Sequence, residues 1–207
     1  MALPSATSRG CVVNVRWSAA AGATVTALDA FGNAVSGAPV TLSATGTGNT
    51  LTPSGTTDGN GVMTGILSST VAGAKTVTAI VGQVTIAQQP SVTVNPAAAD
   101  HLTFSTQPQD VTLGSAIAPP VVVTAWDAFD NVASGFVGDV VMALGHDGSL
   151  LGTGTLGGTK TVAAVSGVAT FGDLTVDPLG IGYTLVASAT GLTGAESSGF
   201  TVLSLLP

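Results

Sequence analysis

Hydrophobic and polar residues alternate along many short stretches of the chain. Val25 and Ala27 alternate with threonines, and Val140, Met142 and Leu144 occupy every second position of a later stretch. Successive side chains of a β-strand point to opposite faces, so this alternation predicts strands with one face in a core and the other in water. No segment has a sustained apolar stripe with the period of a helix. The pattern therefore predicts an all-β protein.

Turn-forming residues separate the alternating stretches. Short strands interrupted by turns every roughly 8–12 residues are typical of a β-sandwich or a β-barrel. Gly, Asn, Asp and Pro favour such turns because they adopt or stabilise the required backbone conformations. The turn signals include Gly32-Asn33, the run from Asp58 to Gly61, Asp147-Gly148 and Asp177-Pro178.

The chain contains an internal repeat. Residues 23–37 read ATVTALDAFGNAVSG, and residues 121–135 read VVVTAWDAFDNVASG. The two Asp-Ala-Phe triplets begin at Asp29 and Asp127, which are 98 positions apart (127 − 29). A repeat of about 100 residues is the size of one small β-sandwich. The sequence therefore predicts two tandem antiparallel β-sandwiches.

The spacing between the copies grows along the chain. Gly61 matches Gly167 at a distance of 106 positions (167 − 61), and Val94 matches Val202 at a distance of 108 (202 − 94). The second copy therefore carries about ten additional residues. We place this insertion in the Gly-rich stretch 145–160.

These matches predict the domain organisation. Domain 1 covers residues 23–95, a short linker covers 96–100, and domain 2 covers 101–207. Residues 1–22 form an N-terminal extension with two interpretations. Cys11–Trp17 alternates and could form a first strand, or the stretch is foreign to the repeat. In the second case an unpaired sheet edge is left open to another chain.

Composition excludes one class of function, nucleic-acid binding. Only 7% of residues are charged, with a net charge of −7, against about 25% charged residues in an average domain. Ten of the eleven acidic residues are Asp, which favours turns, so we expect the acids in loops. Four basic residues are too few to neutralise a run of phosphates, so nucleic-acid binding is excluded.

The sequence indicates no targeting signal and little scope for cysteine chemistry. No apolar run reaches the roughly 20 residues that a membrane-spanning helix needs. The segment Met1–Gly10 has no apolar stretch, so we expect no secretory signal here and interpret the chain as a fragment. Cys11 is the single cysteine, which excludes an intramolecular disulfide and a cysteine-based zinc site.

The first copy carries a family resemblance. Asp29 to Asn33 (DAFGN), followed by Gly37 and Pro39-Val40, resembles the bacterial Ig-like domains of the invasin and intimin type. The later segments Thr57–Val62 and Val77–Ala79 fit the same pattern.

The second copy is similar to a related module that is common in very large bacterial surface proteins. The segments Pro119–Val123, Gly167–Phe171 and Gly182–Leu185 carry this likeness. The two likenesses together cover about residues 23–203. One departure is Asp130, which stands where the first copy has Gly32.

The resemblance implies a fold and a role. The fold is two tandem immunoglobulin-like antiparallel β-sandwiches. The role is that of a structural or adhesive segment, a spacer or stalk, in an extracellular or cell-surface bacterial protein. Its partners would be neighbouring Ig-like repeats and a host or surface ligand, and it would not be an enzyme. The alternatives are a glycan- or calcium-binding module and a small hydrolase, since fold does not decide function.

Two motifs suggest chemistry that their context does not support. Residues 152–157 match GxGxxG, but a dinucleotide site needs a helix after this motif, and here it lies in a β repeat. His146, Asp147 and Ser149 bring together acid, base and hydroxyl groups, but residues this close in sequence cannot converge as a triad does. We predict no catalytic and no cofactor-binding residues, and would begin a search for a hydrolase at His146.

Calcium is the one cofactor that the sequence suggests. Asp127, Asp130 and Asn131 supply oxygen ligands within five positions, as a hard cation requires. Asp100 could approach the same end of the sandwich. The alternative is that these residues only shape the turn.

Two aromatic residues have predicted structural roles. Tyr183 follows Asp177-Pro178 near the start of a late strand, where its hydroxyl could donate to the backbone as in a tyrosine corner. Trp126 lies in a repeated strand where the first copy has Leu28, so we expect it in a core or an interface.

Overall fold

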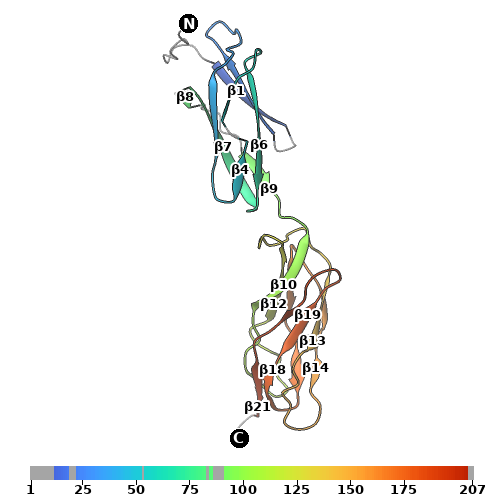
Figure 1. Ribbon diagram of the computed structural model, residues 1–207. Coiled ribbons are helices and arrows are strands. Elements are labelled where there is room, and N and C mark those ends of the chain that lie inside the picture. Colours follow the sequence, from blue (N-terminus) through green and yellow to red (C-terminus); the bar gives the residue numbers. More distant parts are fainter. Residues whose placement is uncertain (1–11, 19–21, 53, 83, 86–90, 205–207) are drawn as a thin grey trace. The chain divides into compact units, whose positions relative to one another are not determined.

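The computed structural model describes residues 12–18, 22–52, 54–82, 84–85 and 91–204 (Figure 1). The chain divides into two compact units, Met1–Asn95 (unit 1) and Pro96–Pro207 (unit 2). The described residues contain strands and no helix. The predicted all-β class, in two tandem units, is confirmed.

Unit 1 is built from two sheets. One has the strand order β1-β2-β6-β4, and the other has the order β5-β3-β7-β8, with β9 also paired to β7. The strands are β1 (Val12–Ser18), β2 (Gly22–Leu28), β3 (Pro39–Ala44), β4 (Asn49–Leu51), β5 (Gly55–Thr56), β6 (Val62–Ser69), β7 (Gly73–Val81), β8 (Val84–Thr85) and β9 (Ser91–Val94).

The N-terminal extension supplies a strand. β1 pairs antiparallel with β2 from Val12 opposite Leu28 to Ser18 opposite Gly22. Of the two interpretations of this stretch, the structure has the strand, which begins one residue after Cys11. Cys11 itself lies outside the described residues. β1 is an edge strand of its sheet.

The alternating residues of unit 1 form its core. Val25 and Ala27 of β2 are buried, as are Val40 and Leu42 of β3. They pack with Met63, Ala79 and Val81 in one cluster. Burial at every second position is the reason these segments form half-buried strands.

Unit 2 repeats this plan with additional strands. Its sheets have the orders β10-β12-β16, β14-β17, β15-β13-β19-β20 and β11-β21-β18. The strands are β10 (Ala99–Thr106), β11 (Val111–Thr112), β12 (Val121–Asp127), β13 (Asp139–Leu144), β14 (Thr155–Gly157), β15 (Thr161–Ala163), β16 (Val168–Phe171), β17 (Thr175–Asp177), β18 (Gly180–Tyr183), β19 (Leu185–Ser188), β20 (Ala195–Glu196) and β21 (Phe200–Leu203).

One strand pair departs from the predicted antiparallel arrangement. β11 runs parallel to β21, with Val111 opposite Val202. β10 pairs with β12 in one sheet, and residues 107–110 then carry the chain to the other sheet. β11 continues in the direction of β10, which makes it parallel to β21.

Two predicted boundaries differ from the structure. The predicted linker 96–100 overlaps β10, which begins at Ala99 because Ala99 pairs with Asp127. The predicted insertion of ten residues in the stretch 145–160 accounts for only six. β3 and β13 start 100 positions apart (139 − 39), and β6 and β16 start 106 apart (168 − 62). Of the other four additional residues, two lie before the start of β13 (100 − 98) and two lie after the start of β16 (108 − 106).

Candidate functional site

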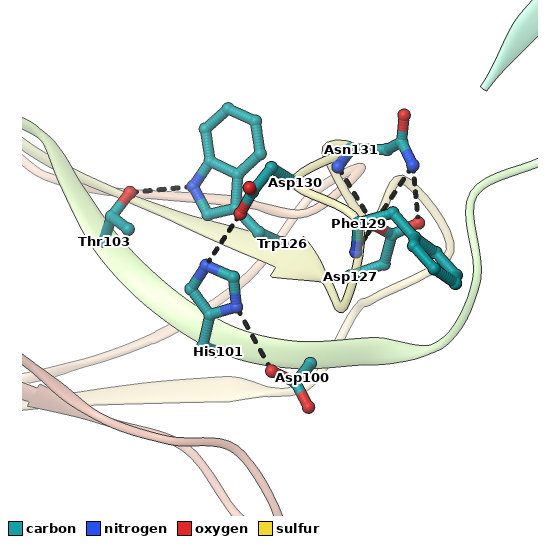
Figure 2. A network of polar contacts seen from close by, with 8 residues as sticks. All are labelled: Asp100, His101, Thr103, Trp126, Asp127, Phe129, Asp130 and Asn131. Carbon is teal, nitrogen blue, oxygen red and sulfur yellow. Dashed lines mark hydrogen bonds and ion pairs between the residues drawn. The ribbon is translucent and has the colours of Figure 1, made fainter. Parts of the chain in front are cut away.

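The predicted calcium residues of unit 2 lie in the turn after β12, at Asp127 to Asn131 (Figure 2). Asp127 is fully buried. Its Oδ1 accepts the backbone N–H groups of Phe129 and Asn131, both at 2.9 Å. The Nδ2 group of Asn131 donates to both carboxylate oxygens, at 3.1 and 3.0 Å. The carboxylate thus holds the turn through four N–H contacts.

The turn after β2 in unit 1 has the same construction. Oδ1 of Asp29 accepts N–H groups of Phe31 and Asn33, at 2.8 and 2.9 Å. Nδ2 of Asn33 donates to Oδ2 at 2.9 Å. The repeated Asp-Ala-Phe triplet therefore encodes a backbone turn that an Asp carboxylate and an Asn amide close.

Asp127 has one further donor. The backbone N–H of Ala97 donates to its Oδ2 at 2.9 Å. Burial raises the pKa of Asp127, but the hydrogen bonds from Asn131, Ala97 and Phe129 outweigh burial and lower this pKa from 3.8 to about 2. The carboxylate is therefore ionised throughout the physiological range. It fixes the start of unit 2, at Ala97, to the turn at the end of β12.

Asp130 takes part in a separate contact. Its carboxylate lies 3.7 Å from Nε2 of His101, and Asp100 lies 3.3 Å from Nδ1 of the same ring. Figure 2 shows the imidazole between the two acids. The predicted approach of Asp100 to this end of the sandwich is thus present, and His101 mediates it. Sequence reasoning missed His101 because one of its two partners, Asp130, lies 29 positions further along the chain (130 − 101).

The structure brings only part of the calcium set together. Asp127 and Asn131 are in contact, but Asn131 presents its amide nitrogen to the carboxylate, and nitrogen donors are not calcium ligands. Asp130 faces His101 instead. Within the described residues, no group of three or more His, Cys, Asp and Glu side chains is arranged to hold a metal. Calcium binding stays a hypothesis beside the alternative that these residues only shape the turn.

Other acidic side chains have the same role as Asp127. Asp58, Asp110, Asp147 and Asp173 each accept a backbone N–H within their own unit. Backbone hydrogen bonds lower the pKa of Asp147 and of Asp173. The expectation that the acids serve turns and loops holds for these residues.

The two motifs that suggested chemistry are parts of one long loop, which Asp147 closes. Its carboxylate accepts N–H groups of Ser149 and Gly154, at 3.0 and 2.9 Å. The hydroxyl of Ser149 donates to the Gly152 carbonyl at 2.7 Å. The second half of the GxGxxG match, residues 155–157, is strand β14, whereas a dinucleotide site would need the motif to open a helix. The Asp147 carboxylate and the Ser149 hydroxyl thus both hold the shape of this loop.

The structure shows the hydrogen bonds of the two aromatic residues, Tyr183 and Trp126. The Tyr183 hydroxyl donates to the Pro178 carbonyl at 3.0 Å, which confirms the tyrosine corner. Burial and the charge of Asp147 raise the pKa of Tyr183, so the hydroxyl stays a donor. Trp126 is half-buried, and its Nε1 donates to Thr103 at 2.7 Å.

The sequence pattern did not indicate a buried lysine in unit 1. Lys75 in β7 is 4% exposed, and its Nζ donates to the Thr47 carbonyl at 3.2 Å. Asn49 donates to the carbonyls of Thr45 and Gly46. The two side chains together hold the loop 45–48, which explains how a charged residue is accommodated inside the sandwich.

No curated protein matches the chain. Among solved structures, the adhesin InvE of Yersinia pseudotuberculosis is 24% identical, with 87% of this chain and 53% of that chain covered and a TM-score of 0.38. The Escherichia coli adhesin FdeC is 22% identical over 97% and 65%, with a TM-score of 0.44. InvD of Y. pseudotuberculosis is 18% identical over 89% and 52%, with a TM-score of 0.46. The chain thus spans between 52% and 65% of these structures.

No helix long and apolar enough to cross a membrane occurs among the described residues. Residues 18–95 match the family of bacterial Ig-like domains (group 1). This match covers the strands of unit 1 from β2 to β9 and confirms the resemblance drawn from the DAFGN turn. Within unit 1, residues 18–95 are thus similar to group 1 bacterial Ig-like domains.

Proposed function

We propose that the chain is a structural or adhesive Ig-like segment of an extracellular bacterial surface protein, acting as a spacer or stalk. The observation that carries this proposal is the family match of residues 18–95, together with the repeat of the same Asp-closed turn in unit 2. Repetition of one module suits a part whose purpose is length.

The use of polar groups supports a role without catalysis. Among the described residues, the carboxylates of Asp29, Asp127, Asp147 and Asp173 are occupied by N–H groups of their own unit. An enzyme needs such groups to converge on a substrate with at least one left available. His146 donates its backbone N–H to the Thr184 hydroxyl.

A pulling experiment on the intact chain tests the spacer role. The chain is held between two handle proteins and stretched in an optical trap. A spacer gives two abrupt steps, each lengthening the chain by about 3.5 Å per residue of the unit that opens. Gradual extension without steps would contradict the proposal, because a stalk must keep its folded length under tension.

A binding assay separates the spacer from the alternative of a ligand-binding module. Beads coated with the chain are applied to cultured host cells and to a glycan array, with uncoated beads as the control. A spacer gives no retention above the control. Saturable retention that free chain competes away would replace the spacer proposal with an adhesive or glycan-binding one.

A further inference from the structure

The two units differ in the segment that follows their first strand. In unit 2, residues 107–120 separate β10 from β12 and include β11. In unit 1, only residues 19–21 separate β1 from β2. Three residues cannot cross to the other sheet and return. Unit 1 therefore has no counterpart of β11 between its first two strands.

β11 covers the edge of the last strand of unit 2 through three contacts. The backbone N–H of Leu113 donates to the Leu203 carbonyl at 2.8 Å. The carboxylate of Asp110, just before β11, accepts the N–H of Thr201 at 2.7 Å. The Val111 side chain is 8% exposed and belongs to the core. The segment Asp110–Leu113 thus satisfies the strand edge and completes the hydrophobic interior.

The last strand of unit 1 lacks this cover among the described residues. Val94 of β9 corresponds to Val202 of β21 at a distance of 108 positions (202 − 94). The described pairs of β9 are all with β7, from Thr76 opposite Ser91 to Gly73 opposite Val94. By the same correspondence, Thr93 takes the place of Thr201, so its N–H faces the edge opposite β7, where no described strand pairs with β9.

The last strand of unit 1, β9, is also less buried than the last strand of unit 2, β21. Phe200 and Val202 of β21 are each 2% exposed. Their counterparts Val92 and Val94 of β9 are only half-buried. The inner face of β9 is therefore less completely covered than the inner face of β21, on the side where unit 2 inserts Val111.

We propose that the edge of β9 that no described residue covers is a binding site for an extended strand of a partner polypeptide. The strand runs parallel to β9 and reproduces what Asp110–Leu113 provides in unit 2. A carboxylate accepts the Thr93 N–H, the next residue inserts an aliphatic side chain beside Val94, and a later N–H donates to the Asn95 carbonyl. Strand addition of this kind gains affinity from main-chain hydrogen bonds and selectivity from alternate side chains. This proposal goes beyond the spacer role and does not depend on it.

The test uses the full chain, isotopically labelled for NMR, and a synthetic peptide with the sequence of residues 107–116 (QPQDVTLGSA). We expect saturable shifts and slowed amide exchange at Ser91–Asn95. Peptides with Val111→Asp or Asp110→Ala are the matched controls. We expect Val111→Asp to weaken binding at least about tenfold, because it would bury an unpaired charge.

A pair of chain variants locates the site. Val94→Lys places a charge on the inner face of β9 and is expected to abolish peptide binding. Thr93→Lys places the same charge on the outer face of the next residue and is expected to retain it. Circular dichroism checks that both variants fold. If Val94→Lys does not fold, the comparison of the three peptides still decides the result.

Five outcomes would overturn the proposal. The first is an absence of saturable shifts at Ser91–Asn95, and the second is binding that survives Val111→Asp. The third is binding that occurs only after residues 1–11 are removed, which would make the chain's own N-terminus the occupant. The fourth is self-association in sedimentation that Val94→Lys abolishes, which would make a second copy the occupant. Shifts confined to Phe200–Leu203 would mean that the peptide only exchanges with β11, and this also counts against the proposal.

Discussion

At the scale of single residues, carboxylates that close turns are the main electrostatic feature of the chain. The pKa of Asp127 is about 2 in the folded protein, below the 3.8 of an unperturbed Asp. Its stabilising contribution is therefore complete above about pH 3.8 and is lost as the pH falls towards 2. The fall in stability at acid pH should therefore depend on Asp127.

We predict that Asp127→Asn lowers the melting temperature of unit 2 at pH 7 and flattens its decline between pH 4 and pH 2. Asn has one acceptor oxygen, so it cannot serve both Ala97 and the turn. The measurement is thermal unfolding followed by Trp126 fluorescence in a Trp17→Phe background, with Asp139→Asn as the exposed control. An unchanged fall in stability at acid pH would show that the Asp127 contacts contribute nothing.

The centre of each turn requires a left-handed backbone. Gly32 has φ of +84°, and Asp130, in the matching position, has φ of +60°. A Cβ at Gly32 would meet nothing within 4 Å, so the cost of substitution is purely conformational. We predict that Gly32→Ala lowers the unfolding free energy by about 1 kcal/mol. Gly32→Asp should cost less, since Asp tolerates this conformation better. Urea unfolding of the two variants tests the order, and equal costs would contradict it.

At the scale of elements, the tyrosine corner connects the segment before β18 to the core. Tyr183 is fully buried and packs against Phe200, with ring centroids 6.0 Å apart. We predict that Tyr183→Phe, which removes the bond to Pro178 and keeps the ring, lowers the unfolding free energy by about 1 kcal/mol. Tyr183→Ala also removes the ring and should cost about 3–5 kcal/mol. Chemical denaturation of both variants separates the hydroxyl from the ring, and a neutral Tyr183→Phe would mean that the bond is not stabilising.

Sequence analysis predicted an element correctly where the signal lay within the element itself, and missed it where the element depends on distant residues. The alternation around Val25 and Val140 placed β2 and β13 correctly. β11 was missed because its two residues carry no alternation. Its position depends on β21, which lies about ninety residues further along the chain (202 − 111 = 91). The same distinction holds for the contacts of the candidate site. Contacts inside the DAF turn were foreseeable, whereas the bond from Ala97 to Asp127 spans thirty positions.

At the scale of the whole molecule, each unit has its own core. Leu42 of β3 and Met142 of β13 occupy matching positions and belong to separate clusters. We predict two calorimetric transitions, with Leu42→Ala lowering only one and Met142→Ala only the other, by about 2–5 kcal/mol each. Among the described residues, the core of unit 2 includes Phe104, Phe171 and Phe200, so its transition should be the higher. A single transition that both variants shift equally would contradict this.

Calcium should leave the melting behaviour unchanged. The donors around Asp127 already occupy its carboxylate, and a cation would have to displace them and open the turn. We predict identical melting curves with millimolar calcium and with excess chelator, measured by calorimetry on the intact chain. A rise in melting temperature with calcium would mean that the native state binds the ion. It would assign Asp127, Asp130 and Asn131 as ligands.

The sequence alone determined the strand class, the repeat of about 100 residues and the identity of the turns. The strand class and the turns depend on neighbours within a few positions, where alternation and the chemistry of Asp, Asn and Gly act directly. The repeat is a direct match between two parts of the sequence. Only the tertiary structure decided that β11 runs parallel to β21, that Ala97 completes the shell of Asp127, and that His101 lies between Asp100 and Asp130. These contacts depend on which strands become neighbours when two sheets pack, and residues far apart in sequence carry no local mark of that choice.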